Sequence, residues 1–352
     1  MVNVLIVEDS RVVSEYLYYI FSKDPQIQVI GNVSNGRLAV DFIREHKPDV
    51  ITMDIDMPIM NGLEATRIIM STNPVPILIV TASRNAQEVS TSIEAMAAGA
   101  LAVIEKPVGI GHPKEEELAE RLVNMVKLMA GVKVVKRKAK TPVTAPIKLA
   151  SVKPVALSEN HMIPNIVAIG VSSGGPQALQ KVFAGISAKF PAPIVVVQHI
   201  AAGFLSGLVN WLGNSVRIPL HIAEEGEKML PGHIYFAPDL HQMGVTRSGR
   251  IHLMPPVQNT GICPSVAHLF KSVLDAYGAS SLGILLTGMG SDGSRELKDL
   301  LDSGALTIAQ SKESSLIFGM PGVAIQLDAA KYILSAEEIG SYLLEIETKF
   351  MK

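Results

Sequence analysis

The first 125 residues alternate short apolar runs with stretches that place apolar residues at helical spacing. The apolar runs are rich in Val and Ile and are bounded by polar or turn residues, which is typical of buried strands. Because strands that alternate with helices build a parallel sheet covered on both faces, this part predicts a doubly wound α/β domain. Its expected strands are 3–7, 27–33, 49–55, 76–82 and 102–107.

The same alternation returns after residue 160, so a second α/β domain with its own parallel sheet is expected. Two further segments, 232–239 and 249–255, lie beside Gly-rich turns and predict antiparallel strands. The fold class is therefore α/β: an N-terminal doubly wound parallel sheet, then a C-terminal α/β parallel-sheet domain with an antiparallel hairpin. The strands expected in the second parallel sheet are 166–171, 193–199, 282–288 and 305–310.

The stretch between the two domains has no periodic apolar face. Residues 133–153 carry seven Lys and Arg and no acidic residue, and prolines recur there, which predicts an extended linker. A basic arm that binds nucleic acid is the alternative, because clustered Lys neutralises phosphates, but the stretch lacks aromatic residues that stack on bases. The expected division is a domain over 1–125, a basic, proline-containing linker over 126–160 and a second domain over 161–352.

Composition narrows the class of protein. The chain has 352 residues, 48% of them hydrophobic, which is long enough for two domains that each bury a core. Its single cysteine excludes an internal disulfide and suits a reducing compartment. Glu8 and Asp9 come too early for a signal peptide, and no apolar run approaches the roughly 18 to 20 residues that cross a bilayer. A cytoplasmic protein without membrane insertion is expected.

Polar residues follow the apolar strands of the first domain. The carboxyl ends of neighbouring parallel strands face one crevice, which is where such folds bind ligands. Carboxylates gathered there repel one another unless a cation is present, and their hard oxygen atoms suit Mg²⁺. Two further strand ends add a hydroxyl group and a fixed positive charge to these carboxylates. The residues concerned are Glu8, Asp9, Asp54, Asp56, Thr81 and Lys106.

The motifs "EDS", "DIDMPIMNG", "TA" and "EKP", found in this order, resemble the receiver domain of two-component response regulators over residues 1 to about 122. The resemblance implies that Asp54 is phosphorylated and that Glu8, Asp9 and Asp54 hold Mg²⁺. It also implies that Thr81 and Lys106 contact the phosphoryl group. A cation and a lysine would offset the negative charge that accumulates when a carboxylate attacks phosphorus.

A pair of serines follows the first strand of the second domain, in "IVAIGVSSGGPQAL" at 166–179. Gly170, Ser172 and Gly174 fit G-x-S-x-G, a tight strand-to-helix turn that exposes a nucleophilic hydroxyl. Two other interpretations stay open: turn residues with an N-cap before Pro176, and a phosphate cradle at a helix N-terminus. A serine hydroxyl is weak until a base activates it, so the choice depends on the rest of the chain.

Two other strand ends supply partners for Ser172. His199 ends the strand 193–199, and Asp292 lies in a Gly-rich turn after the strand 282–288. If these strands are parallel, the three side chains emerge at one edge of the sheet as the nucleophile, base and orienting carboxylate of acyl-transfer chemistry. The chain order of an α/β-hydrolase is Ser, Asp, His, but no histidine follows Asp292, which disfavours that fold.

Other chemistries have weaker support. Cys263 is a candidate for the nucleophile of a cysteine hydrolase, but it does not follow a strand and has no neighbouring charge that would lower the pKa of its thiol. The nine histidines show no H-E-x-x-H or comparable pairing, so a zinc site is poorly supported.

The second domain contains six further motifs: "IGVSSGGPQAL", "VVVQHIAAGF", "EGEKMLPGHIYFAPDLHQM", "PSVAHLF", "ILLTGMGSDG" and "AQSKESSLIFGMP". Together they resemble the chemotaxis protein-glutamate methylesterase family, and the receiver and linker in front complete its architecture. The resemblance implies that Ser172 attacks the γ-methyl ester of a chemoreceptor glutamate, that His199 acts as general base and then acid, and that Asp292 orients the imidazole. It also implies that Ser173, at a position usually filled by Thr, supports the site, and that the amide of Met289 is associated with the oxyanion hole.

The same resemblance implies the partners and cofactors. A chemotaxis histidine kinase would supply the phosphoryl group, and the methylated cytoplasmic helices of chemoreceptors would be the substrate, with no nucleic acid involved. Mg²⁺ would be needed in the receiver and no cofactor for ester hydrolysis. Members of the family also deamidate particular receptor glutamines. The alternative function is a response regulator whose second domain binds a target without catalysis.

A few positions depart from the family patterns. Two residues after the Gln-His pair differ from the usual Met-Pro, and the usual Arg and Asp of R-P-S-V-D are missing. The missing Arg and Asp remove charge near the expected substrate groove, and all of these changes leave the three triad residues in place. One receiver position also lacks its usual Phe or Tyr. The departing residues are Val103, Ile200, Ala201, Cys263 and Ala267.

Overall fold

The computed structural model describes residues 1–81, 86–107, 109, 111, 115–132, 134, 163–256 and 262–351. The expected linker falls mostly on residues 135–162, which lie outside the described residues. The chain divides into two compact units, Met1–Pro142 and Val143–Lys352.

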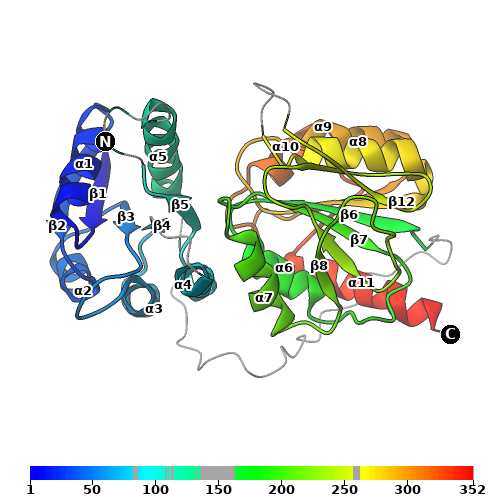
Figure 1. Ribbon diagram of the computed structural model, residues 1–352, viewed down its shortest axis with the longest axis horizontal. Helices are drawn as coiled ribbons and strands as arrows, with labels where there is room; N and C mark the ends of the chain where they lie inside the picture. Colours follow the sequence, from blue (N-terminus) through cyan, green and yellow to red (C-terminus); the bar gives the residue numbers. More distant parts are fainter. Residues whose placement is uncertain are drawn as a thin grey trace. The chain divides into compact units, whose positions relative to one another are not determined.

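The first unit is a parallel sheet whose strands alternate with helices (Figure 1). Its elements are β1 (Val2–Val7), α1 (Arg11–Ser22), β2 (Ile27–Val33), α2 (Gly36–Glu45), β3 (Val50–Met53), α3 (Gly62–Thr72), β4 (Ile77–Thr81), α4 (Ala86–Ala98), β5 (Ala102–Glu105) and α5 (Glu115–Ala130). The five strands lie in the order β2-β1-β3-β4-β5 and pair in parallel. This confirms the doubly wound sheet, and the full burial of β3 and β4 explains their unbroken apolar runs.

Short polar caps start the first three helices of this unit. Ser10, Asn35 and Asn61 precede α1, α2 and α3, and each side-chain oxygen accepts a hydrogen bond from a backbone N–H in the first turn of its helix. The caps allow each helix to begin soon after a strand ends. The polar residues that follow the strands are therefore held in short turns at one edge of the sheet.

The turn after β3 holds Ile59 in a strained conformation. Its φ angle is +70°, in the left-handed region that disfavours side chains branched at Cβ, and the Met60 N–H donates to the Pro58 carbonyl at 2.7 Å, which closes a γ-turn. The Ile59 side chain is 83% exposed, so it gains little from burial. The backbone strain at this position is therefore not offset by packing.

We expect Ile59→Gly to have a higher free energy of unfolding than Ile59→Ala by about 1 kcal/mol, because both remove the exposed side chain but only glycine relieves the left-handed strain. Urea unfolding of the two variants, followed on the transition of the first unit, measures the difference. An alanine variant as stable as the glycine variant would show that Ile59 is unstrained.

The second unit is built on a larger parallel sheet. Its elements are β6 (Ile166–Val171), α6 (Gly175–Phe183), β7 (Ile194–Gln198), α7 (Leu205–Gly213), β8 (Leu220–Ile222), β9 (Ile234–Phe236), β10 (Gln242–Val245), β11 (Ile251–Met254), α8 (Val266–Tyr277), η1 (Gly278–Ser280), β12 (Ser281–Leu285), α9 (Ser294–Asp302), β13 (Leu306–Gln310), α10 (Met320–Gln326), β14 (Tyr332–Leu334) and α11 (Ala336–Phe350). Seven strands lie in the order β14-β13-β12-β6-β7-β9-β8 and all pair in parallel. The strands β10 and β11 form a separate antiparallel pair.

The expected antiparallel hairpin is present, but one of the two segments assigned to it was wrong. The segment 232–239 contributes β9, which pairs in parallel with both β7 and β8. The partner of β11 is instead β10, which follows the turn after β9. The error arose because a short apolar run beside glycines does not show which neighbouring strand it will pair with.

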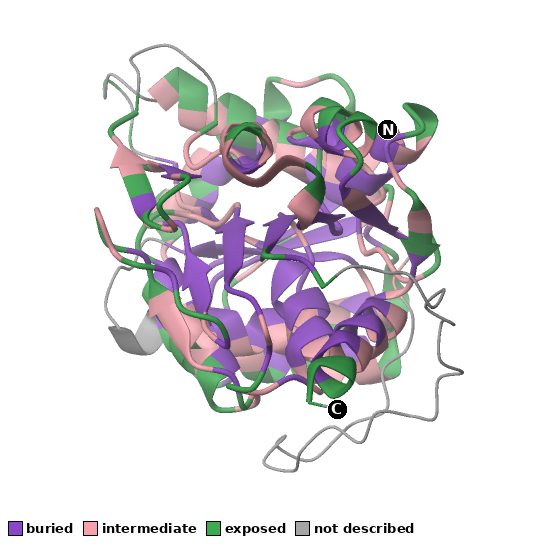
Figure 2. Ribbon diagram, turned by 90° about the vertical axis from the view of Figure 1, so that its right-hand side faces the viewer, coloured by how far each residue is buried: buried purple, intermediate pink, exposed green. Residues whose placement is uncertain are grey.

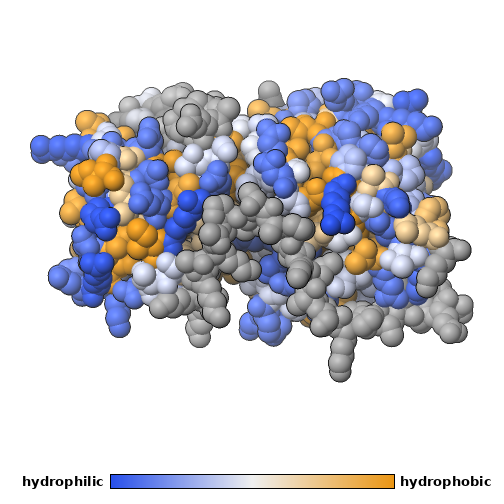
Figure 3. All heavy atoms as spheres, turned by 90° about the horizontal axis from the view of Figure 1, so that it is seen from below, coloured by the Kyte–Doolittle hydropathy of each residue, from blue (hydrophilic) through white to orange (hydrophobic). Residues whose placement is uncertain are grey.

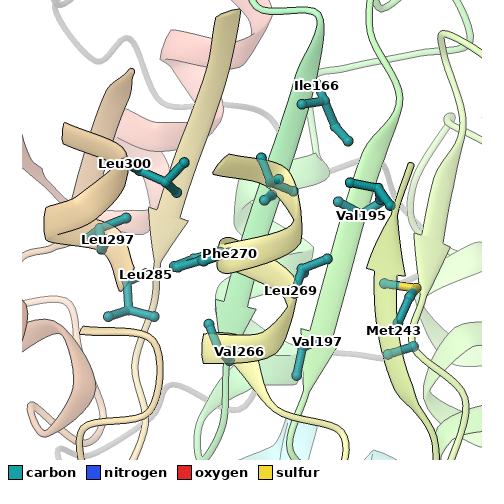
Figure 4. Packing of buried hydrophobic residues seen from close by; sticks show 14 of the residues in the cluster. Ile166, Val195, Val197, Met243, Val266, Leu269, Phe270, Leu285, Leu297 and Leu300 are labelled. Carbon is teal, nitrogen blue, oxygen red and sulfur yellow. The ribbon is translucent and has the colours of Figure 1, made fainter. Parts of the chain in front are cut away.

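Helices cover both faces of the large sheet (Figure 1), and the strands between them are the most buried part of the unit (Figure 2). The helices α8, α9 and α10 lie on one face, and α6, α7 and α11 on the other. On the first face, α8 packs its apolar side over the central strands, with Leu269 and Phe270 directed into the cluster (Figure 4). This packing fixes the N-terminus of α8 near the carboxyl ends of β6 and β12.

The molecular surface mixes hydrophilic side chains with smaller hydrophobic areas on the face drawn in Figure 3. Among the helices of the described residues, none combines the length and the apolar character that crossing a membrane requires.

Candidate active site and phosphorylation site

The first unit gathers carboxylates and one lysine at the carboxyl edge of its sheet. Glu8 and Asp9 follow β1, Asp54 follows β3 and Lys106 follows β5. The Lys106 Nζ lies 2.7 Å from Oε2 of Glu8 and 2.9 Å from Oδ2 of Asp54. One carboxylate oxygen from each of Glu8, Asp9 and Asp54 lies within 4.8 Å of the others, so the three side chains can hold one cation.

Burial sets the electrostatics of this group. It raises the pKa of Asp54 and of Glu8, and the nearby Lys106 offsets only part of the effect. Burial alone would lower the pKa of Lys106, but the carboxylates of Glu8 and Asp54 outweigh it, so the pKa of Lys106 is raised and its positive charge is secure. Two buried carboxylates with one lysine leave negative charge at the site, which favours a bound divalent cation.

The other predicted residues of this edge take different positions. Thr81 is the last residue of β4 and is buried. Asp56 is exposed in the turn after β3 and takes no part in the cation group. Val103 lies half-buried in β5.

In the second unit, strand register places Ser172 beside His199. The last paired residues of β6 and β7 are Val171 and Gln198, so Ser172 and His199 each stand one residue beyond them. The His199 N–H donates to the Val171 carbonyl at 2.9 Å, which continues the ladder to that level. The two residues therefore leave the sheet at the same level, from neighbouring parallel strands.

Asp292 approaches the same imidazole from the turn after β12. The Nε2 atom of His199 lies 3.0 Å from Oδ2 of Asp292, and both side chains are mostly buried. Within the described residues this short contact does not reach hydrogen-bond geometry, and Nε2 of His199 has no other hydrogen-bond partner. Catalytic hydrogen bonds often align only when substrate is bound. His199 and Asp292 are therefore in contact, and Ser172 leaves the neighbouring strand at the level of His199.

The Asp292 carboxylate is held by the N-terminus of α8. Its Oδ1 accepts hydrogen bonds from the Ser265 hydroxyl at 2.9 Å and the Ala267 N–H at 3.0 Å, and its Oδ2 accepts one from the Val266 N–H at 2.7 Å. Burial opposes ionisation, but His199 and these backbone donors outweigh it and lower the pKa of Asp292. Asp292 is therefore a fixed carboxylate at the positive end of a helix.

The glycines of the G-x-S-x-G motif have separate structural reasons. Gly170 lies inside β6, where an added Cβ would stand 2.2 Å from a Val266 methyl group. The lack of a side chain at Gly170 therefore lets α8 pack against the strand. Gly174 has a φ angle of +81° and precedes α6 as a left-handed cap. The motif thus combines one packing requirement with one turn requirement, and both place Ser172 between β6 and α6.

Two backbone N–H groups near Ser172 are available to bind a substrate oxygen. In the described part of the chain, no hydrogen bond uses the N–H of Ser173 or of Met289. Ser173 is the residue after the serine, and the loop before Met289 runs against the site, since a Cβ on Gly288 would lie 2.6 Å from Cβ of Ser172. Both N–H groups are therefore candidates for donors to the oxyanion that acyl transfer forms.

Two residues of this site were missed from the sequence. Ser265 caps α8 and bonds Asp292, and a serine just before a helical apolar pattern is a signal that could have been used. Thr287 is buried, donates its hydroxyl to the Ser173 carbonyl at 2.9 Å and accepts from the Ile317 N–H at 2.9 Å; nothing in the sequence marks it. Cys263 is half-buried, and burial raises the pKa of its thiol, which argues against a thiolate nucleophile.

Comparison with known proteins matches both units to known families. The model of the CheB methylesterase family matches residues 167–343, and the model of the response regulator receiver domain matches residues 4–119. A protein-glutamate methylesterase/protein-glutamine glutaminase of Nitrosospira multiformis is 47% identical over 98% of this chain and 97% of its own length. One from Geobacter metallireducens is 46% identical over 98% of this chain and 99% of its own length.

Solved structures match the two units one at a time. The catalytic domain of the CheB methylesterase of Thermotoga maritima is 33% identical, covers 53% of this chain and all of that one, and has a TM-score of 0.48. The response regulator domain of the CheB of the same organism is 34% identical, covers 38% of this chain and 98% of that one, and has a TM-score of 0.34. The family models and the full-length relatives together show that this chain belongs to the CheB family of protein-glutamate methylesterases, with a receiver domain before the methylesterase domain.

Proposed function

We propose that this chain hydrolyses the γ-methyl esters of chemoreceptor glutamates under the control of phosphorylation at Asp54. The observation that carries the proposal is the 3.0 Å contact between Nε2 of His199 and Oδ2 of Asp292. These two residues and Ser172 follow three neighbouring strands of one parallel sheet. A second domain that only binds a target would not need a buried carboxylate fixed against an imidazole. Full-length relatives named for both methylesterase and glutaminase activity support the same reaction class.

The chain's own residues account for each step. Ser172 Oγ attacks the ester carbonyl carbon while His199 takes its proton, and because Nε2 faces Asp292, Nδ1 is the ring nitrogen left for that role. The N–H groups of Ser173 and Met289 would bind the oxyanion. His199 then protonates the departing methanol, and water hydrolyses the acyl-enzyme by the same path in reverse. With a glutamine side chain the leaving group is ammonia.

The first unit supplies the control. The carboxylates of Glu8, Asp9 and Asp54 fit Mg²⁺ in ligand type, spacing and charge. When bound, the cation would offset the negative charge of a phosphoryl group as it is transferred from a chemotaxis histidine kinase to Asp54. Lys106 is already in contact with Asp54 and would hold one phosphoryl oxygen, and Thr81 would hold another.

We expect a small phosphodonor such as acetyl phosphate, given with Mg²⁺, to raise the methylesterase rate of the whole chain. The reason is that phosphorylation changes the charge of a buried acidic group. This change shifts the equilibrium between a less active and a more active conformation if it stabilises one of them more than the other. Methanol release is the measurement. Asp54→Ala should show no activation, and activation of that variant would place the phosphorylation elsewhere.

The reaction and its substrate are tested together by mass spectrometry of receptor peptides. Peptides carrying glutamate γ-methyl esters are incubated with the protein, and loss of the methyl group at defined glutamates is expected. Conversion of glutamine to glutamate in parallel peptides reports deamidation. If neither change occurs while the phosphorylated protein binds the peptides, the second domain is a binding module and the proposal is wrong.

A further inference from the structure

One buried amide lies between the proposed nucleophile and the proposed base. Gln198 is the last residue of β7, and only 4% of it is exposed. Its Nε2 donates one hydrogen bond to the Ser172 carbonyl and another to the His199 carbonyl, both at 2.9 Å. An amide NH₂ group has two hydrogens, so these two bonds use its full donor capacity. A single planar group thereby joins the peptide units of both residues.

The other end of this amide depends on Gly175. The Oε1 of Gln198 is buried and accepts no hydrogen bond within the described residues. It lies where a side chain of Gly175 would begin, since an added Cβ there would stand 2.0 Å from Oε1 and 2.8 Å from Nε2. Gly175 is the first residue of α6 and has no left-handed backbone that would call for glycine. Its missing Cβ is therefore explained by the space that Gln198 occupies.

We propose that Gln198 is a positioning residue of the esterase, which fixes the peptide of Ser172 relative to that of His199, and that Gly175 is required to admit it. This inference rests on the proposed roles of Ser172 and His199. A buried acceptor without a partner lowers stability, so Gln198 is a costly choice if its only task is to fill space. The two donor bonds give it a task that an apolar side chain of similar length cannot perform.

The inference predicts a loss in the chemical step. Gln198→Met keeps the length of the side chain and removes both donors, and Gln198→Glu keeps its shape and sets charged oxygens against two carbonyls. Both variants should lower kcat for methanol release from a methyl-esterified receptor peptide, on the order of 10²-fold, because small displacements of reacting groups have effects of this size. KM should change little, since neither donor bond touches the substrate.

Gly175 gives an independent test through a double-mutant cycle. Gly175→Ala should displace the amide and lower kcat about as much as Gln198→Ala does. In the Gln198→Ala background the added methyl group meets empty space, so the double variant should be no slower than the slower single variant. Losses that multiply instead would show that the two residues act separately, and would overturn the inference.

A matched control separates positioning from loss of stability. Thr307→Val removes a fully buried hydroxyl in β13, away from both proposed residues, that accepts the Lys331 N–H at 3.0 Å together with the Thr307 carbonyl at 3.1 Å. It should lower the unfolding temperature and leave kcat unchanged, whereas the Gln198 variants should lower kcat while still folded. A folded Gln198→Met with wild-type kcat would contradict the inference. Ser172→Ala in the same assay guards the premise, since full activity of that variant would refute the proposed nucleophile instead.

Discussion

Replacing Ser172 with alanine is expected to lower the rate of ester hydrolysis by about 10⁴-fold or more, as loss of a triad member does in other hydrolases. The fold should survive, because no hydrogen bond in the described part of the chain uses the Ser172 hydroxyl and the side chain is small. Methanol release from a methyl-esterified peptide measures the rate, and the unfolding temperature checks the fold.

Ser173→Ala is the matched control for this variant. It removes a neighbouring hydroxyl but keeps the backbone N–H that would bind the oxyanion, so its loss of activity should be much smaller. The reverse ranking of the two variants would move the nucleophile to position 173. Wild-type turnover by both variants would exclude a serine nucleophile at this turn.

Replacing Asp292 with asparagine is expected to lower kcat by about 10⁴-fold, the effect of the same change in a serine protease triad. Both carboxylate oxygens of Asp292 accept backbone N–H donors from α8, so an amide NH₂ in either orientation faces another donor. The asparagine will turn or shift to avoid that clash. The imidazole then loses both its negative partner and its fixed orientation.

The same substitution should destabilise the fold in a manner that depends on pH. The folded-state pKa of Asp292 is lowered, so its contribution to stability is present above the ordinary aspartate value of about 3.9 and is lost as pH falls through the folded pKa. Urea unfolding should show wild type more stable than Asp292→Asn at about pH 7 and a narrower gap at about pH 3. The exposed Asp302→Asn is the control and should show little difference at either pH. A gap that stays constant with pH would contradict the lowered pKa.

Buried parallel strands were the easiest part of the fold to predict. Their apolar runs are long, β-branched and followed by turn residues, and β1, β4, β6 and β13 appear within a residue or two of the expected bounds. The short edge strands β8 and β14 were not predicted, because three residues carry no periodic signal. The segment 232–239 was assigned the wrong pairing because strand direction depends on distant partners.

The site was predictable as far as strand ends determine it. In a parallel sheet, the residues that follow β6, β7 and β12 lie at one edge. The sequence has Ser172, His199 and Asp292 after these three strands. What the sequence could not show is how α8 approaches that edge. The contact of Val266 with Gly170, and the hydrogen bond from Ser265 to Asp292, depend on packing between elements far apart in the chain.

Hydrolysis by this chain is expected to proceed through an ester between Ser172 Oγ and the glutamyl carbonyl carbon. Rapid acid quench of the protein during turnover of a methyl-esterified receptor peptide, followed by proteolysis and mass spectrometry, detects that ester. The glutamyl peptide is expected on Ser172, with one methanol released for each adduct formed. An adduct on Ser173 or Cys263, or rapid turnover with no adduct on the protein at any quench time, would contradict it.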